Sequence, residues 1–324
     1  MNKLILATET GVVICKREGD DWRESRRGLK DQHATSIIAR EGVILAGTED
    51  GIFRSDDEGQ TWQEASRGLA TRHVRWMAYH PDISDFEFAG TEPANIFISH
   101  DGGGSWRACP EVSQLRDRFN WSLPYSPEAG CVRGFAFHDS RVYAAVEVGG
   151  VLVSDDRGET WGLAEGSDGN PDLEGPPEPL IYPDVHSLEV HPSSADLVYA
   201  PTGGGFYRSN DGGKTWKLFY DCYCRAVWVD PNDPEHLILS PADGVDRNGR
   251  IEETRDGGQN WSLASNGLQV PWRRGMVERL FQADDELFAV LSNGQLLTAS
   301  LSRLEWKRIL PSLSDVNAVI TMTE

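Results

Sequence analysis

One eight-residue pattern recurs five times along this chain of 324 residues and constrains its fold more than any other feature. Each copy has a hydroxyl residue, an aspartate two positions later, a glycine two positions after that, and a tryptophan at the end. An aspartate can cap the N–H groups of its own turn, and glycine accepts a positive φ. The pattern predicts a tight hairpin turn. The copies run from Ser55 to Trp62, Ser99 to Trp106, Ser154 to Trp161, Ser209 to Trp216 and Thr254 to Trp261.

Two further segments keep part of the pattern. The segment from Cys15 to Trp22 retains Gly19 but has Arg17 in place of the aspartate, and Trp306 ends a segment that keeps only the spacing. The seven final tryptophans are 40, 44, 55, 55, 45 and 45 residues apart, which is typical of a four-stranded propeller blade. We therefore predict an all-β fold: one seven-bladed β-propeller domain, residues 1–324, of four-stranded antiparallel blades.

The two ends of the chain predict how the ring closes. Most repeats have two strands before the turn motif, for example 74–79 and 86–90, or 185–190 and 197–200. The first repeat lacks an innermost strand, because the chain starts at the strand 4–7. The tail 316–321 has the pattern of an innermost strand without a blade. We expect it to complete the first blade, since closure removes exposed sheet edges.

These repeats resemble the Asp-box, or BNR-repeat, propellers over essentially the whole chain. That superfamily includes sialidases, two-propeller xyloglucanases, sortilin-type receptors and photosystem II assembly factors. A sialidase would have an Arg-Ile-Pro motif near its start and six blades, and a xyloglucanase would need a second propeller. The chain looks most like single-propeller bacterial proteins of the sialidase-like or photosystem II assembly factor-like kind. The resemblance implies a fold and a structural role for the boxes, not a reaction.

The mouth of the propeller channel opposite the boxes is the expected functional site, because the innermost strands begin there. Side chains two residues apart share a side of a strand. Aligned innermost strands place Asn317, Thr35, Arg75, Arg133, His186, Arg225 and Glu278 together. Two residues earlier stand Asp315, His33, His73, Cys131, Asp184, Tyr223 and Met276. The turns after the second strands add Glu9, Glu49, Glu92 and Glu147.

Two interpretations of this mouth stay open. In the first, Arg75 pairs with Glu92 and Arg133 with Glu147 inside their own blades, and the pairs only fix strand ends. In the second, Arg75, Arg133 and Arg225 converge on an anionic or polyhydroxylated ligand, since guanidinium groups suit carboxylates and vicinal hydroxyls. Glu92 and Glu147 would then be candidate catalytic acid and base groups, with His186 between them. Arg225 has no equivalent glutamate in its blade, which offers only Asp243, and this imbalance favours a bound anion.

Long connections near the same mouth extend the candidate binding site. The segment 107–130 is expected to be a loop that exposes Phe119, Trp121 and Tyr125, as a carbohydrate platform would. The predicted ligand-binding residues are Arg75, Arg133, Arg225, Glu278, Trp121, His73 and Asp184. A divalent metal held by His33, His73, His186 and Asp184 is a further possibility, but no local metal motif supports it, and we predict neither metal nor cofactor.

The charge of the chain excludes one class of partner. With a net charge of −20 and a pI near 4.8, it lacks the basic stripe that nucleic-acid binding requires. No apolar run approaches a membrane span, and five irregularly spaced cysteines argue against a disulfide framework. We expect a cytoplasmic monomer, unless a signal was removed before residue 1.

Three functional classes remain open on the sequence alone. The chain is a binding or scaffold propeller for a small anionic or saccharide ligand or a protein, a carbohydrate-active hydrolase or lyase using Glu92 and Glu147, or an assembly factor whose arginine patch meets a partner protein. Nothing in the sequence names a substrate.

Overall fold

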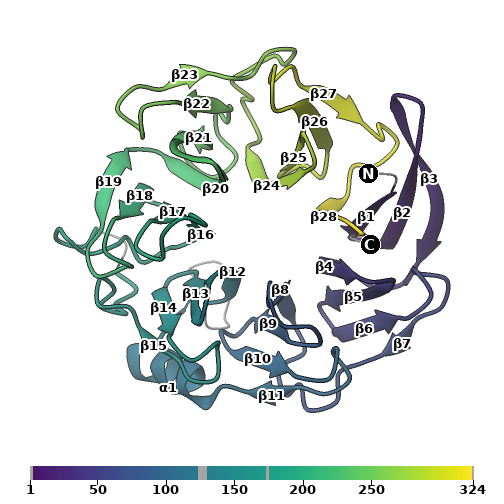
Figure 1. Ribbon diagram of the computed structural model, residues 1–324, viewed down its shortest axis with the longest axis horizontal. Helices are drawn as coiled ribbons and strands as arrows, with labels where there is room; N and C mark the ends of the chain where they lie inside the picture. The colour runs from purple at the N-terminus through teal and green to yellow at the C-terminus, as the bar shows by residue number, and fades with distance from the viewer. Residues whose placement is uncertain (1–2, 123–129, 173–174, 323–324) are drawn as a thin grey trace.

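Seven four-stranded antiparallel sheets form a ring around a central axis (Figure 1). This computed structural model describes residues 3–122, 130–172 and 175–322. Within each blade the strands follow one another from the axis to the rim, and each pairs with its neighbour in sequence except at the closure of the ring. The predicted seven-bladed, all-β propeller is confirmed.

Each blade has four strands, named from the axis outward. Blade 1 has β28 (Val316–Thr321), β1 (Lys3–Thr8), β2 (Gly11–Glu18) and β3 (Asp21–Gly28). Blade 2 has β4 (Ala34–Arg40), β5 (Val43–Thr48), β6 (Gly51–Ser55) and β7 (Gln63–Glu64). Blade 3 has β8 (Val74–Tyr79), β9 (Glu87–Thr91), β10 (Ile96–Ser99) and β11 (Arg107–Ala108). Blade 4 has β12 (Val132–His138), β13 (Arg141–Val146), β14 (Gly150–Ser154) and β15 (Gly162–Leu163). Blade 5 has β16 (Glu189–Val190), β17 (Val198–Thr202), β18 (Gly205–Ser209) and β19 (Lys217–Tyr220). Blade 6 has β20 (Tyr223–Asp230), β21 (Asp233–Ala242), β22 (Glu252–Thr254) and β23 (Ser262–Leu263). Blade 7 has β24 (Val277–Ala283), β25 (Glu286–Leu291), β26 (Leu296–Ser300) and β27 (Lys307–Ile309).

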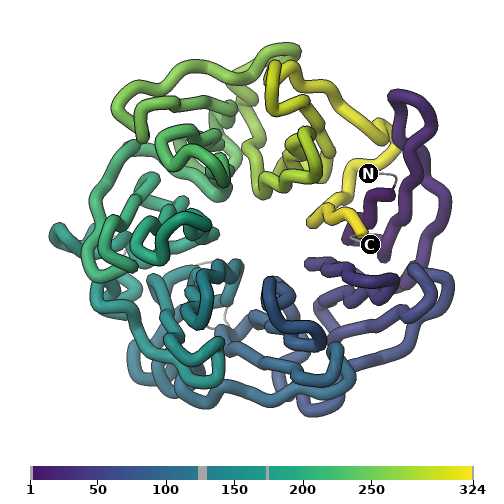
Figure 2. Tube along the Cα trace, in the orientation of Figure 1, coloured from purple at the N-terminus to yellow at the C-terminus, as the bar shows by residue number. Residues whose placement is uncertain are grey.

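The ring closes as the tail sequence predicts. Strand β28 pairs antiparallel with β1, with Leu4 opposite Thr321 and Ala7 opposite Ala318. Figure 2 shows the yellow end of the trace beside its purple beginning in this blade. Because the first and last parts of the chain share one sheet, the ring has no open edge at its seam, and opening it would break the backbone hydrogen bonds of that pair.

Each turn motif closes the hairpin between the third and fourth strands of its blade. In blade 2, Asp57 Oδ1 accepts hydrogen bonds from the N–H groups of Gln60 and Thr61 at 2.9 and 2.8 Å. The Thr61 hydroxyl donates to Oδ2 at 2.7 Å, and Gly59 has a φ of 80°. The bonds from Thr61 lower the pKa of Asp57 to about 2. The aspartate of this box is therefore bonded within its own turn, as expected for a structural motif.

Apolar clusters between neighbouring blades form the core. The cluster between blades 2 and 3 includes Leu45, Met77, Phe97 and Trp106. Trp106 is 5% exposed, and its Nε1 donates to the carbonyl of Ala65 in the preceding blade at 2.9 Å. Burying an aromatic side chain of this size contributes about 3 kcal/mol of transfer free energy. The box tryptophan thus joins neighbouring blades in addition to ending its own turn.

Two local expectations from the sequence are wrong. The expected loop 107–130 contains a helix, α1 (Pro110–Phe119), with proline in its first turn and Asn120 in a left-handed conformation at its end, both common at helix boundaries.

The expected strand 185–190 reduces to β16 and an isolated bridge between Val185 and Thr202. Between them, the His186 N–H still donates to the Pro201 carbonyl of its own blade at 3.0 Å, while Ser187 Oγ donates to the Arg225 carbonyl of the next blade at 2.9 Å.

No helix in the described part of the chain is both long and apolar enough to cross a membrane.

Candidate functional site

A β-bulge in the innermost strands brings the predicted channel residues to one level of the ring. In blade 3, Val74 pairs with Thr91 and Trp76 with Gly90, so Arg75 is the one extra residue. Bulges re-aim side chains and often lie beside functional sites. A register shift at the corresponding place occurs in blades 1, 2, 4, 6 and 7. The residues within these shifts include Asn317, Thr35, Arg133, Arg225 and Glu278.

Two of the predicted ligand arginines are engaged with protein acids, including one acid from another blade. Arg133 of blade 4 contacts Glu147 of its own blade at 3.4 Å and Glu278 of blade 7 at 3.4 Å. Arg225 of blade 6 also pairs with Glu278, and its Nη2 donates to the Tyr223 hydroxyl at 2.9 Å. Burial alone would lower the pKa of Arg133, but Glu147 and Glu278 raise it above its ordinary value. These groups form a network linking blades 4, 6 and 7.

The expectation that Arg225 lacks an acidic partner is therefore wrong. The aligned repeats offer only acids from the same blade, whereas Glu278 comes from the next one. Asp243, the acid that the alignment assigns to this blade, instead contacts Arg250 at 3.4 Å. Because Arg225 is paired, its charge gives no reason to expect a bound anion there.

The two candidate catalytic acids also lie in ion pairs inside their own blades. Glu92 faces Arg75 at 3.6 Å and His73 at 3.9 Å, and its side chain is 10% exposed. Burial and Arg75 lower the pKa of His73. Glu147 is 2% exposed and accepts a hydrogen bond from the Cys131 thiol at 3.0 Å. Both pairs match the first of the two interpretations, in which acids and arginines fix strand ends.

His186 stands beside a carboxylate, with each ring nitrogen engaged. It is fully buried, and its Nδ1 lies 2.8 Å from the Cys224 carbonyl. Its Nε2 is 3.2 Å from Asp184 Oδ2 and 3.3 Å from the Tyr223 hydroxyl. One donor atom each from Glu147, Asp184 and His186 lies within 4.8 Å of the others. These three could hold a divalent cation, although the Arg133 guanidinium already faces Glu147.

The four-residue metal set considered from the sequence does not assemble. Among the described residues, neither His33 nor His73 joins a group of three potential ligands. His33 instead pairs through Nδ1 with Glu49 at 3.0 Å, and its Nε2 is 3.0 Å from the side chain of Asn317. His33 and His73 precede the neighbouring blades 2 and 3, whereas His186 and Asp184 belong to blade 5.

A polar cavity of about 390 Å³ opens on this face. Three of the predicted binding residues, Arg75, Arg133 and Glu278, line it. The other predicted site residues, Glu92, Glu147, His186, Arg225, His73, Asp184 and Trp121, are not among its described lining residues. Blades 7, 1 and 2 supply most of the wall. The remaining polar side chains of the wall are Glu9, His33, Thr35, Glu49, Arg279, Ser292, Asn293, Ser314, Asp315 and Asn317.

Arg279 is the residue that the sequence alignment missed. Its guanidinium carbon lies 4.0 Å from the centre of the Trp76 ring, a cation–π contact. Within the described chain no acid lies at ion-pair distance from it. Burial lowers its pKa, as does the neighbouring Arg133, and the opposing effect of Glu278 does not make up for them. Arg279 lines both the mouth cavity and a smaller cavity of about 80 Å³, so it lies where the two meet.

The bulge explains the omission. The alignment takes one residue per innermost strand, which selects Glu278. Because the strand alternation is interrupted between Val277 and Arg279, two successive side chains reach the cavity. The sequence feature that could have pointed to Arg279 is its place directly after Glu278, the aligned position in the strand.

The aromatic platform is wrong for Trp121. This side chain is 1% exposed, and its Nε1 donates to the Gly169 carbonyl at 2.9 Å. It packs in the cluster between blades 3 and 4, and Phe119 lies against the same cluster. Phe119 is the last residue of α1, and Trp121 follows the helix, where its N–H donates to the Arg116 carbonyl. Tyr125 lies outside the described residues.

The box of blade 5 matches a known family, and part of the chain resembles a known enzyme. The family described as BNR/Asp-box repeat matches residues 207–218. The chain therefore carries a BNR/Asp-box repeat at this position. It is 24% identical over 236 residues to an oligoxyloglucan reducing-end-specific xyloglucanase of Emericella nidulans, a match covering 60% of this chain and 27% of that protein. The chain thus spans about a quarter of the relative it matches.

Solved structures show the same fold at low identity. An ancestral GH74 enzyme superimposes with a TM-score of 0.64 at 18% identity, covering 98% of this chain and 39% of the enzyme chain. YCF48 bound to D1 peptide gives a TM-score of 0.62 at 15% identity, covering 92% of this chain and 90% of YCF48. At these identities the similarity establishes the propeller and no shared ligand.

Proposed function

We propose that this propeller is a binding module that takes a carboxylate-bearing ligand or peptide segment in the mouth cavity. The observation that carries the proposal is Arg279, a cation in a cavity wall with no acid at ion-pair distance in the described chain. An arginine keeps its proton in proteins. Its positive surroundings therefore favour a bound anion over an empty site.

Arg75 would be the second contact to the ligand. It lines the same cavity, its side chain is 32% exposed, and its distance to Glu92 is 3.6 Å. That spacing is long for a charge-assisted hydrogen bond, so a ligand carboxylate can compete for this guanidinium. The similar fold of YCF48, solved with a D1 peptide, supports a peptide as one class of ligand.

The test compares one acid with its neutral analogue. Succinate should bind to the wild-type chain by titration calorimetry, whereas succinamide should not. Arg279→Met should weaken succinate binding at least about tenfold, the effect of losing one charge-assisted contact. The same substitution should leave the melting temperature unchanged or raise it, because it removes like-charge repulsion. Arg274→Met, which removes an exposed arginine outside the cavity lining, is the matched control.

A peptide with a free C-terminal carboxylate and its amidated form extend the comparison to protein partners. Preference for the free acid that disappears in Arg279→Met supports the proposal. Equal succinate binding by wild type and Arg279→Met would overturn it.

A glycoside hydrolase is the second candidate, supported by the matched region of the xyloglucanase. The burial of Glu147 and the pairing of Glu92 with Arg75 speak against these two as its acid and base. Release of reducing sugar from xyloglucan oligosaccharides, lost in both Glu92→Gln and Glu147→Gln, would favour this candidate over a binding module.

A further inference from the structure

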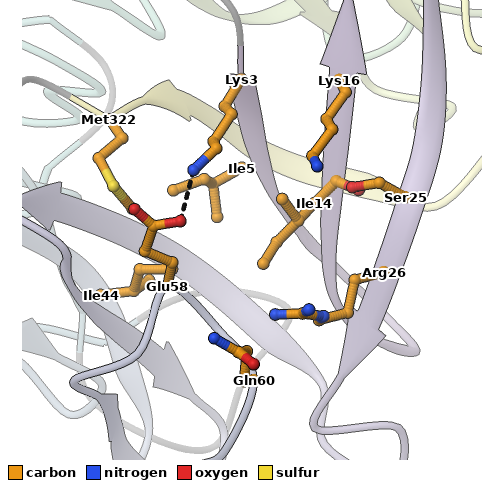
Figure 3. A pocket seen from close by; sticks show the side chains of 10 residues that line it. All are labelled: Lys3, Ile5, Ile14, Lys16, Ser25, Arg26, Ile44, Glu58, Gln60 and Met322. Carbon is orange, nitrogen blue, oxygen red and sulfur yellow. Dashed lines mark hydrogen bonds and ion pairs between the residues drawn. The ribbon is translucent and has the colours of Figure 1, made fainter.

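A separate hollow of about 130 Å³ lies between blades 1 and 2, on the face that carries the boxes (Figure 3). Three strands of blade 1 supply Lys3, Lys16 and Arg26, and the box turn of blade 2 supplies Glu58 and Gln60. Figure 3 shows Lys3 joined to Glu58, with Lys16 and Arg26 on the opposite side of the hollow. Ile5, Ile14 and Ile44 form its floor.

The cations of this hollow are gathered at an electrostatic cost. Lys3 and Lys16 are directly opposite one another on paired strands, an arrangement that destabilises a sheet. Arg26 is opposite Ile14 on the next strand of the same sheet, two positions from Lys16. Glu58 pairs with Lys3, and within the described chain no acid lies at ion-pair distance from Lys16 or Arg26.

The charges do not balance. Three cations, Lys3, Lys16 and Arg26, face one carboxylate, Glu58, which leaves two positive charges in a chain whose net charge is −20. Lys3 lowers the pKa of Glu58, with help from Lys16 and Arg26, so this carboxylate stays ionised well below neutral pH. A phosphate group carries about −1.5 to −2 charges at pH 7 and matches the excess.

We propose that this hollow is a binding site for a phosphate group, either inorganic phosphate or a monoester. Lys16 and Arg26 donate to its oxygens, with Ser25 and Gln60 at the rim. The volume is well below the roughly 300–1,000 Å³ of a pocket that encloses a whole drug-sized ligand, so the site holds the phosphoryl group and leaves any larger substituent in solvent.

Such a ligand would act on the closure of the ring. The hollow is formed by β1, β2 and β3, by Met322 after the closing strand β28, and by the neighbouring blade. A dianion there contacts three strands of the blade that contains both ends of the described chain. Because it binds only where these strands are assembled, it stabilises the folded ring by mass action.

The test uses the charge of the probe. Inorganic phosphate is mostly a dianion at pH 7.5 and mostly a monoanion at pH 5.5, since its second pKa is about 7, somewhat above that of a monoester, whereas sulfate is a dianion at both. Thermal shift and calorimetry should detect both anions at pH 7.5. At pH 5.5 phosphate should bind several-fold more weakly, while sulfate should be unaffected.

Variants locate the site. Lys16→Gln and Arg26→Gln should each weaken phosphate binding about tenfold, and the double variant should abolish it. Lys30→Gln, which removes an exposed charge beyond β3, is the matched control and should bind normally. Arg279→Met should also bind phosphate normally, which separates this site from the mouth cavity.

The outcomes decide the proposal. Competition by glycerol phosphate would indicate that monoesters are accepted, and its absence would restrict the site to inorganic phosphate; each is consistent with the proposed site. Phosphate binding that survives the Lys16→Gln, Arg26→Gln double variant, or that is lost in Arg279→Met, would overturn the proposal. Absence of any phosphate or sulfate effect on wild-type melting would also overturn it.

Discussion

Replacing Arg133 by methionine tests whether the axial ion-pair network stabilises the ring. Arg133 is 7% exposed and contacts both Glu147 and Glu278. Methionine keeps much of the volume but leaves Glu147, which is 2% exposed, without its cation. Removing one partner of a buried ion pair lowers the free energy of unfolding by about 3–5 kcal/mol, because the other charge is left uncompensated. A large domain loses roughly 2 °C in melting temperature for each kcal/mol of lost stability. The melting temperature of Arg133→Met should therefore fall by about 6–10 °C.

The decisive measurement is a double-mutant cycle by denaturant unfolding. Glu147→Gln in the Arg133→Met background removes the stranded carboxylate, so the double variant should be more stable than Arg133→Met alone. The coupling free energy should reach about 1–3 kcal/mol, as for residues in one ion-pair network. Arg23→Met, at an exposed pair with Glu18, should change stability by less than about 1 kcal/mol. If Arg133→Met has the same melting temperature as the wild type, the ion-pair network does not stabilise the ring.

Three further perturbations address the seam, the boxes and a buried acid. Deleting residues 312–324 removes β28 and leaves β1 as an unpaired inner edge, so the truncated chain should aggregate on size-exclusion chromatography; a soluble monomer with unchanged melting would contradict closure by β28. Trp161→Ala should cost about 3–5 kcal/mol in urea unfolding, since Trp161 is 5% exposed, and should leave succinate binding by the folded protein unchanged. Burial raises the pKa of Glu87 from 4.5 to about 7, so the folded state holds this proton more tightly, and its contribution to stability should be present below pH 4.5 and lost as pH rises to about 7. Glu87→Gln should flatten that slope in unfolding curves taken across this range; an unchanged slope would rule Glu87 out as its source.

The repeat predicts the fold of this chain because each box is a local structure. Thr61 donates to Asp57 and the Gly59 N–H donates to the Ser55 hydroxyl, all within a single turn, so the sequence pattern contains the information needed to place that turn. Strand β28 was predictable for a similar reason: an unpaired inner strand at one end and a missing one at the other have only one economical pairing. Helix α1 was missed because a non-repeated insertion offers no second copy to compare.

The ion pairs between different blades were not predictable from a repeat alignment. Arg75–Glu92 and Arg133–Glu147 lie within blades, and the alignment placed both pairs. Glu278 is different, because it pairs with Arg133 from blade 4 and with Arg225 from the neighbouring blade 6, and one repeat contains no information on contacts between blades. Such contacts depend on the radius of the ring and on side-chain length, which are properties of the assembled propeller.

The ion pairs of Glu278 also explain why Arg279 has no acid at ion-pair distance. Glu278 forms ion pairs with two arginines at once, and it acts on Arg279, the next residue in its own strand, only from beyond ion-pair distance. The arginine left without an acid is therefore not Arg225, which the alignment selected, but its neighbour across the bulge. If Glu278→Gln were made, Arg133 and Arg225 would lose their shared partner and the positive potential around Arg279 would rise. Succinate should then bind more tightly while the ring melts at a lower temperature. Weaker succinate binding in that variant would place the ligand away from Arg279.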